Sequence, residues 1–96
     1  MRTLAAVDHR VADFDAWKEV YDSVRDLQRM GGVRYHQVLR EASDPNRVYV
    51  THVFDTREAA EVFFANEELK ADMAKGGVDA SSIKLMFFEE VEAGEL

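Results

Sequence analysis

The chain has 96 residues, enough for a single domain over residues 1–96 with a modest hydrophobic core. Its net charge of −7 argues against nucleic-acid binding, because contact with phosphates needs a positive surface. It contains no cysteine, which excludes disulfides, thiolate metal sites and thiol nucleophiles. Charged residues come too early in the N-terminal stretch for a secretory signal, and no apolar run is long enough to cross a bilayer. We therefore expect a cytoplasmic protein with no membrane partner.

The first third of the chain predicts a strand and then a helix. The strand covers Thr3–Arg10, because Asp13 and Asp15 just beyond it are typical helix-start residues. In the helix, apolar residues recur every three or four positions and form one stripe. The stripe consists of Phe14, Trp17, Val20/Tyr21, Val24, Leu27 and Met30. Gly31-Gly32 ends the helix, since glycine accepts the left-handed conformation that commonly closes helices.

The middle of the chain predicts a β-hairpin, with strands Val33–Glu41 and Arg47–Phe54. Ser43-Asp44-Pro45-Asn46 joins them and has the composition of a turn. Neither strand alternates cleanly between apolar and polar residues, so the hairpin register and the face that each residue occupies stay open.

The last part predicts a broken helix and a final strand. Asp55-Thr56 caps a helix over Arg57–Phe64, and Asn66 begins a second segment that runs to Lys75. Gly76-Gly77 closes it, and the final strand covers Ile83–Val91.

This order, β-α-β-β-α-β, predicts an α+β fold of the ferredoxin-like type. Its antiparallel sheet has the strand order 4-1-3-2, with two helices on one face. The final strand is apolar on both sides, with Leu85 and Phe87 on one and Met86 and Phe88 on the other. Leaving such side chains in water would forgo several kcal/mol, at about 25 cal/mol per Å² of apolar area. A second copy packed sheet to sheet is the simplest cover, so we expect a homodimer.

Four stretches of the chain resemble a known group of proteins. They are Val11–Lys18, Asp44–Asn46, Val53–Ala60 and Leu69–Met73, the last before Gly76-Gly77-Val78. Together they resemble small proteins of the dimeric α+β barrel superfamily, of the antibiotic biosynthesis monooxygenase-like or cyclase-like kind. The resemblance implies a homodimer whose two sheets form a barrel, with a pocket between sheet and helices in each protomer.

The three histidines all fall on predicted strands. Strand directions place His36 and His52 at one end of the sheet and His9 towards the other, on the order of 15 Å away. A site formed by all three is therefore not expected, and we predict no metal site.

His36 or His52 is a candidate general base, because histidine titrates near neutral pH. Arg34 and Tyr49 could donate hydrogen bonds beside it, and Trp17 and Phe63 could wall a pocket for a flat ligand. Each of these residues also has an ordinary packing or surface role as its alternative.

The resemblance also bears on whether the protein uses a cofactor. Haem-degrading relatives bind iron through a histidine of the second helix, but Arg57–Lys75 contains none. The asparagine, tryptophan and arginine associated with the oxygenases have no position-by-position match. We expect no cofactor.

Three functions remain open. The first is a homodimer that binds a hydrophobic, aromatic or polyketide-like molecule and catalyses cofactor-free oxidation or cyclisation. The second is a non-catalytic binding or structural dimer. The third is a domain that pairs with a different subunit through its exposed sheet face. Whether the protein is an enzyme is not decided by its sequence.

Overall fold

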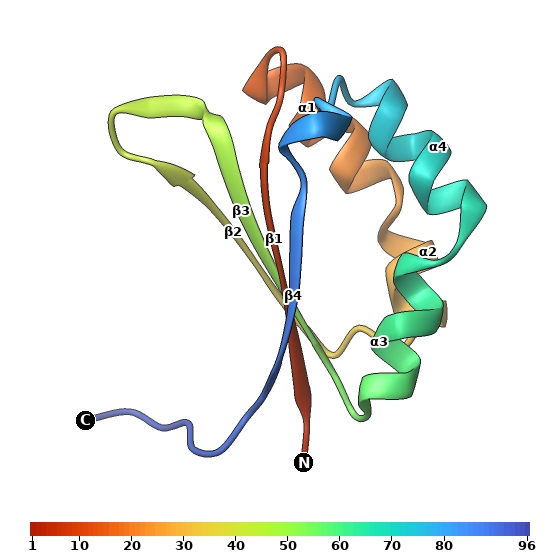
Figure 1. Ribbon diagram of the computed structural model, residues 1–96, viewed down its shortest axis with the longest axis vertical. Helices are drawn as coiled ribbons and strands as arrows, with labels where there is room; N and C mark the ends of the chain where they lie inside the picture. The colour runs from red at the N-terminus through yellow and green to blue at the C-terminus, as the bar shows by residue number, and fades with distance from the viewer.

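The computed structural model describes residues 1–96, in which a four-stranded sheet carries all the helices on one face (Figure 1). The strands are β1 (Thr3–Arg10), β2 (Tyr35–Glu41), β3 (Asp44–Phe54) and β4 (Lys84–Glu89). The helices are α1 (Phe14–Ser23), α2 (Arg25–Met30), α3 (Arg57–Phe64), α4 (Glu67–Lys75) and the short 3-10 helix η1 (Ala80–Ser82). No helix is both long and apolar enough to span a membrane.

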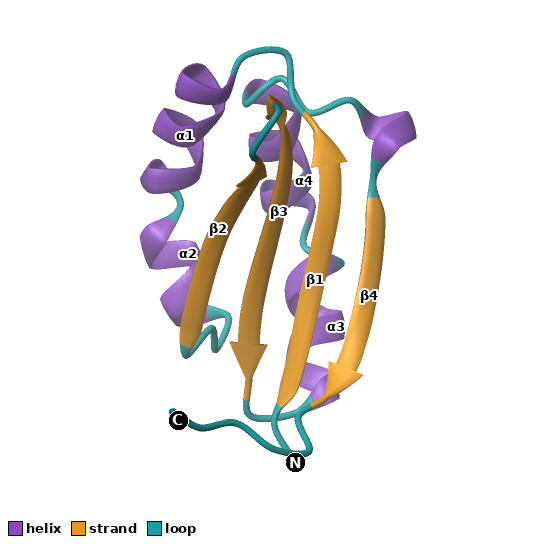
Figure 2. Ribbon diagram, turned by 90° about the vertical axis from the view of Figure 1, so that its left-hand side faces the viewer, coloured by secondary structure: helices purple, strands orange, loops and turns teal.

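The sheet is antiparallel, with the strand order β2-β3-β1-β4 (Figure 2). This is the predicted order 4-1-3-2 read from the other edge. The predicted ferredoxin-like fold is therefore confirmed.

Three predicted caps also begin helices in the structure. The side chain of Asp13 accepts a hydrogen bond from the Ala16 N–H, and Thr56 accepts one from Ala59. Asn66 accepts from the first turn of α4, so the predicted break between α3 and α4 is confirmed. These bonds satisfy amides that have no partner within the helix.

The predicted first helix is wrong in its second half. It is divided at Val24 into α1 and α2, and the change of direction turns Met30 into solvent, where it is 87% exposed. Gln28 is buried instead, at 3% exposure. The prediction from the spacing of apolar residues assumes one straight helix, which this chain does not form.

The hairpin turn also lies elsewhere than predicted. It consists of Ala42 and Ser43, whereas Asp44-Pro45-Asn46 begins β3. Asp44 accepts hydrogen bonds from Arg10 of β1, and the Asn46 side chain accepts one from the Phe14 N–H. These residues therefore bond to neighbouring elements rather than forming the turn.

The two faces of the sheet differ in their surroundings. The inner face packs on the helices and includes Ala5, Val7, Val50, His52 and Phe54. No helix covers the outer face (Figure 1), which includes Leu4, Tyr35, Leu39, Val53, Met86 and Phe88. β4 is shorter than predicted, but Leu85 and Phe87 lie on the inner side and Met86 and Phe88 on the outer side, as the sequence indicates.

Candidate functional site

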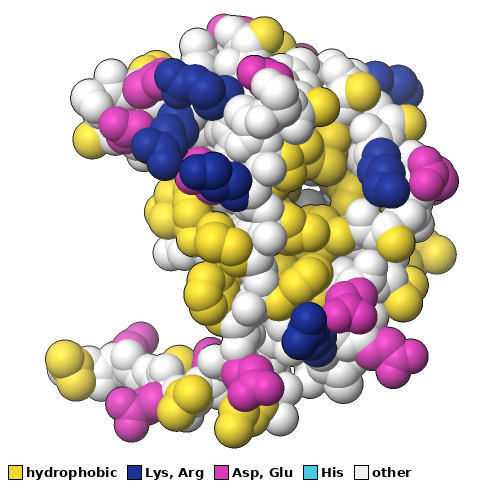
Figure 3. Space-filling view, viewed as in Figure 1, with side chains coloured by type: hydrophobic (Ala, Val, Ile, Leu, Met, Phe, Trp, Pro, Cys, Tyr) yellow, Lys and Arg dark blue, Asp and Glu magenta, His cyan; other side chains and the backbone are white.

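A hollow with hydrophobic walls lies between the inner face of the sheet and the helices, and Figure 3 shows it beside β4. Its cavity has a volume of about 50 Å³. The lining residues come from β1, β3 and all four α-helices: Val7, His9, Trp17, Val20, Tyr21, Val24, Gln28, Val50, His52, Phe63, Phe64, Leu69, Asp72 and Met73. The mostly apolar walls with few polar groups are typical of small-molecule pockets.

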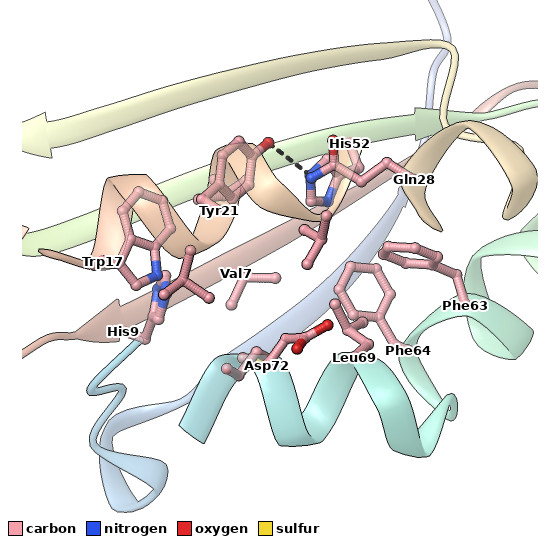
Figure 4. A pocket seen from close by; sticks show the side chains of 14 residues that line it. Val7, His9, Trp17, Tyr21, Gln28, His52, Phe63, Phe64, Leu69 and Asp72 are labelled. Atoms are coloured by element: carbon pink, nitrogen blue, oxygen red, sulfur yellow. Dashed lines mark hydrogen bonds between the residues drawn. The ribbon is translucent and has the colours of Figure 1, made fainter. Parts of the chain in front are cut away.

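Aromatic rings form much of the wall. Trp17 and Tyr21, one helical turn apart on α1, stack with their ring centres 5.0 Å apart. Phe63 and Phe64 of α3 lie on the other side (Figure 4), with ring centres 5.1 Å apart. Such walls suit a flat apolar ligand.

One end of the cavity is polar. Nε2 of His52 lies 3.0 Å from the Tyr21 hydroxyl, and Nδ1 of His36 lies 3.1 Å from the same oxygen. His52 is 5% exposed and Tyr21 8%, whereas His36 is exposed on the edge strand β2. Two buried atoms on this wall have no hydrogen-bond partner: Nδ1 of His52 and Oε1 of Gln28. Since buried polar atoms are seldom left unpaired, the cavity offers a ligand two polar contacts.

Burial controls the charge of this polar end. It lowers the pKa of His52 from 6.5 to about 4, with a smaller contribution from His36. Burial also lowers the pKa of His36, assisted by the nearby cations Arg25 and Lys18. Both imidazoles are therefore neutral at neutral pH, and a neutral imidazole can accept a proton.

His9 lies on the inner face, towards the opposite end of the cavity. Its Nδ1–H donates to the Val48 carbonyl at 3.0 Å, and burial lowers its pKa. His9 is paired with Val48, four residues along β3 from His52, a separation of about 13 Å at ~3.3 Å per residue. The predicted separation of His9 from the other two histidines is therefore seen, and no group of three or more His, Asp or Glu residues is placed to hold a metal ion.

The structure brings four of the six predicted site residues to this cavity. Trp17, Phe63 and His52 line it. His36 does not line it but lies within hydrogen-bond distance of the hydroxyl of Tyr21, which does. Tyr49 lies on the outer face, opposite Asp8 and Leu39 in the sheet. Arg34 is paired with Asp55 at 2.8 Å, and its side chain is 56% exposed. Arg34 and Tyr49 therefore have no contact with this cavity.

Among the lining residues that were not predicted as site residues, three on the helices carry polar groups: Tyr21, Gln28 and Asp72. Tyr21 belongs to the predicted apolar stripe, four positions after Trp17, but it also carries a hydroxyl. Gln28 follows Val24 by four positions, which places a polar residue on the buried side. Asp72 follows Leu69 by three positions, and Figure 4 shows its carboxylate directed into the cavity. A polar residue at helical spacing from buried ones was the available signal.

Solved structures with a similar fold include an oxygenase. SnoaB, a cofactor-independent oxygenase from Streptomyces nogalater, is similar at a TM-score of 0.79 and 13% identity, over 96% of this chain and 95% of that chain. A dimeric ferredoxin-like protein of unknown function from Jannaschia sp. CCS1 is similar at 0.71 and 11%, over 93% and 99%. At such identities the likeness shows a shared fold alone.

A search of curated protein sequences found no match to this chain. The family comparison did find one, to the family described as antibiotic biosynthesis monooxygenase. The match covers residues 4–75, from the first strand to the end of α4. The resemblance noted in the sequence is thereby confirmed, and the chain belongs to the antibiotic biosynthesis monooxygenase family.

Proposed function

We propose that this protein binds a small hydroxylated aromatic compound in the cavity and oxidises it with O2, without a cofactor. The observation that carries the proposal is the unpartnered Nδ1 of His52, a neutral buried base on the wall of a mostly apolar cavity. The family assignment and the fold shared with SnoaB support an oxygenase.

His52 would act as the general base. Its Nδ1 would take the proton of the substrate hydroxyl, while Gln28 Oε1 is a second acceptor on the same wall. The resulting phenolate is electron-rich and reacts with O2 more readily than the phenol. In the overall reaction, one phenol and one O2 give one quinone and one water, so one oxygen atom enters the ring.

The cavity volume restricts the substrate. A benzene ring occupies an engineered cavity of about 150 Å³, whereas this one is about 50 Å³. Entry of a ring therefore requires movement of partly buried wall residues, of which Met73 is the most adaptable. A compound with one or two rings fits this requirement better than a large polyketide.

We also propose that the protein is a homodimer joined through the outer sheet face. Phe88 is 50% exposed there, Leu39 45% and Met86 36%, an apolar surface of the kind that protein partners cover. The Jannaschia protein of similar fold is described as dimeric.

The first test is ligand binding. Trp17 is the only tryptophan, and it is 4% exposed and lines the cavity, so its fluorescence should respond to a bound phenol. We would titrate the purified protein with one- and two-ring phenols and with the same rings lacking the hydroxyl. The phenols should bind more tightly. Failure of every phenol to alter Trp17 fluorescence would overturn the proposal.

The second test is turnover, measured as O2 consumption with the phenols that bind. His52→Gln should retain binding and lower the rate by about 10²–10⁴-fold, the usual contribution of a general base. Arg34→Gln and Tyr49→Phe are controls, since neither residue contacts the cavity, and both should leave the rate unchanged. Binding without O2 consumption would favour the alternative of a non-catalytic binding dimer, which the small cavity also fits.

A further inference from the structure

The Tyr21 hydroxyl connects a buried histidine to an exposed one. It lies 3.0 Å from Nε2 of His52 on β3 and 3.1 Å from Nδ1 of His36 on β2. The two histidines are directly paired across the strands, which places both beneath the same tyrosine. The row His52, Tyr21, His36 therefore runs from the cavity wall to the surface.

The number of hydrogens on the tyrosine links the two histidines. A hydroxyl donates one hydrogen bond, so Tyr21 can donate to only one of the two nitrogens and must accept from the other. When both rings are neutral, one of these two nitrogens carries a hydrogen and the other does not. A change of tautomer at one histidine therefore requires the opposite change at the other.

The unpaired Nδ1 of His52 favours one of the two possible placements of the hydrogens on His52, Tyr21 and His36. If Nδ1 carried the hydrogen, a buried N–H would lack an acceptor, which is rarer in proteins than an unused acceptor. With the hydrogen on Nε2, His52 donates to Tyr21, Tyr21 donates to His36, and Nδ1 is free to accept from a ligand. This is the arrangement suited to a base.

We propose that Tyr21 and His36 form a proton path that connects His52 to solvent. As a proton from a bound hydroxyl reaches Nδ1 of His52, the Nε2 proton passes to the Tyr21 oxygen. The Tyr21 proton passes to Nδ1 of His36, and His36 releases its Nε2 proton to water. The reverse sequence returns a proton to the cavity. No oxidant is involved, and each ring keeps its number of protons.

The charges around the path favour release outward. Burial, and after it Arg25 and Lys18, lower the pKa of His36, while Asp22 opposes them; the three charged residues belong to α1 and α2. His36 is the titratable neighbour that lowers the pKa of His52, after burial, and Asp72 of α4 lies on the cavity wall. A proton that reaches His36 is therefore passed readily to water, since burial and two cations disfavour the imidazolium.

This inference deepens the role proposed for His52, but its test needs no substrate. Long-range ¹H–¹⁵N NMR of the histidine rings separates protonated from unprotonated nitrogens. We expect His52 with its hydrogen on Nε2 and His36 with its hydrogen on Nε2. Protonating His36 by lowering the pH should shift the His52 ring signals, because His36 then donates from Nδ1 and Tyr21 must reverse.

Tyr21→Phe keeps the ring and removes the hydroxyl. In this variant, titration of His36 should no longer shift the tautomer of His52, while Tyr49→Phe on the outer face should retain the coupling. Uncoupled histidines in the unmodified protein, or coupling that persists in Tyr21→Phe, would overturn the proton path. Neither result depends on O2 consumption, so failure of the path and failure of the oxygenase proposal are distinguishable.

Discussion

The rings of Tyr21 and His52 lie almost parallel, 5° apart, with the hydroxyl of one 3.0 Å from Nε2 of the other. The hydrogen bond fixes which edge of the imidazole faces α1. It therefore also fixes Nδ1 on the opposite edge of the ring, where it has no partner. Stacking and hydrogen bonding together orient a base before any ligand is present.

The first prediction concerns stability and pH. Because burial lowers the pKa of folded His52 to about 4 from 6.5, the unfolded chain binds a proton between these values that the folded chain does not. Stability therefore falls as the pH falls through this window, by about 2 kcal/mol between pH 6.5 and about pH 5. Urea unfolding at a series of pH values measures this loss.

His9 and His36 also have lowered pKa values and contribute in the same direction. His52→Gln removes the histidine whose pKa is lowered to about 4, so the stability of this variant should vary less across the same pH window. A pH dependence that is as steep in His52→Gln as in the unmodified protein would show that the imidazole of His52 is not the group responsible.

The second prediction concerns assembly. Met86→Asp and Phe88→Asp each place a carboxylate on the outer face, and burying a charge without a partner is costly. Each should convert the proposed dimer to a monomer in sedimentation-velocity experiments. Val91→Asp, at a residue that is 85% exposed beyond β4, should leave the dimer intact. Dimers that persist in both outer-face variants would exclude this face as the contact.

The third prediction concerns the contact between Gly31 and Phe63. A Cβ at position 31 would lie 2.5 Å from Cδ1 of Phe63, which is too close for two carbon atoms. Gly31→Ala should therefore displace Phe63 and lower the free energy of unfolding by about 1–3 kcal/mol. Gly94→Ala is the matched control, since nothing lies within 4 Å of its Cβ. Equal unfolding midpoints for the two variants would contradict the clash.

The fourth prediction concerns the start of α4. Asn66 Oδ1 accepts from the amides of Glu68 and Leu69, at 2.8 and 3.3 Å. Asn66→Ala should cost about 1 kcal/mol of stability, whereas Asn66→Asp keeps an acceptor and should cost little. Thermal unfolding of the two variants measures the difference, and similar melting temperatures would mean that the cap contributes little.

Much of the fold could be predicted from the sequence, because its signals are local. The side chains of Asp13, Thr56 and Asn66 act within three residues, and they mark the helix starts correctly. The two-faced pattern of β4 likewise depends only on the alternation of residues along a strand.

The site was harder to predict because it depends on relations between elements. The pairing of His36 with His52 requires the hairpin register, which the sequence left open. The position of Tyr21 above both histidines requires the direction in which α1 crosses the sheet. The exposure of Met30 follows from the division of the helix at Val24, which the apolar spacing did not reveal.

The alternation of faces along the strands has a consequence for how this protein can diverge. Val7 and His52 line the cavity, whereas their chain neighbours Ala6 and Val53 face outward. Mutations that would change binding of the proposed ligand and mutations that would change the proposed dimer contact therefore fall at different, interleaved positions. Evolution, or a protein engineer, can alter one property of this small sheet while holding the other constant.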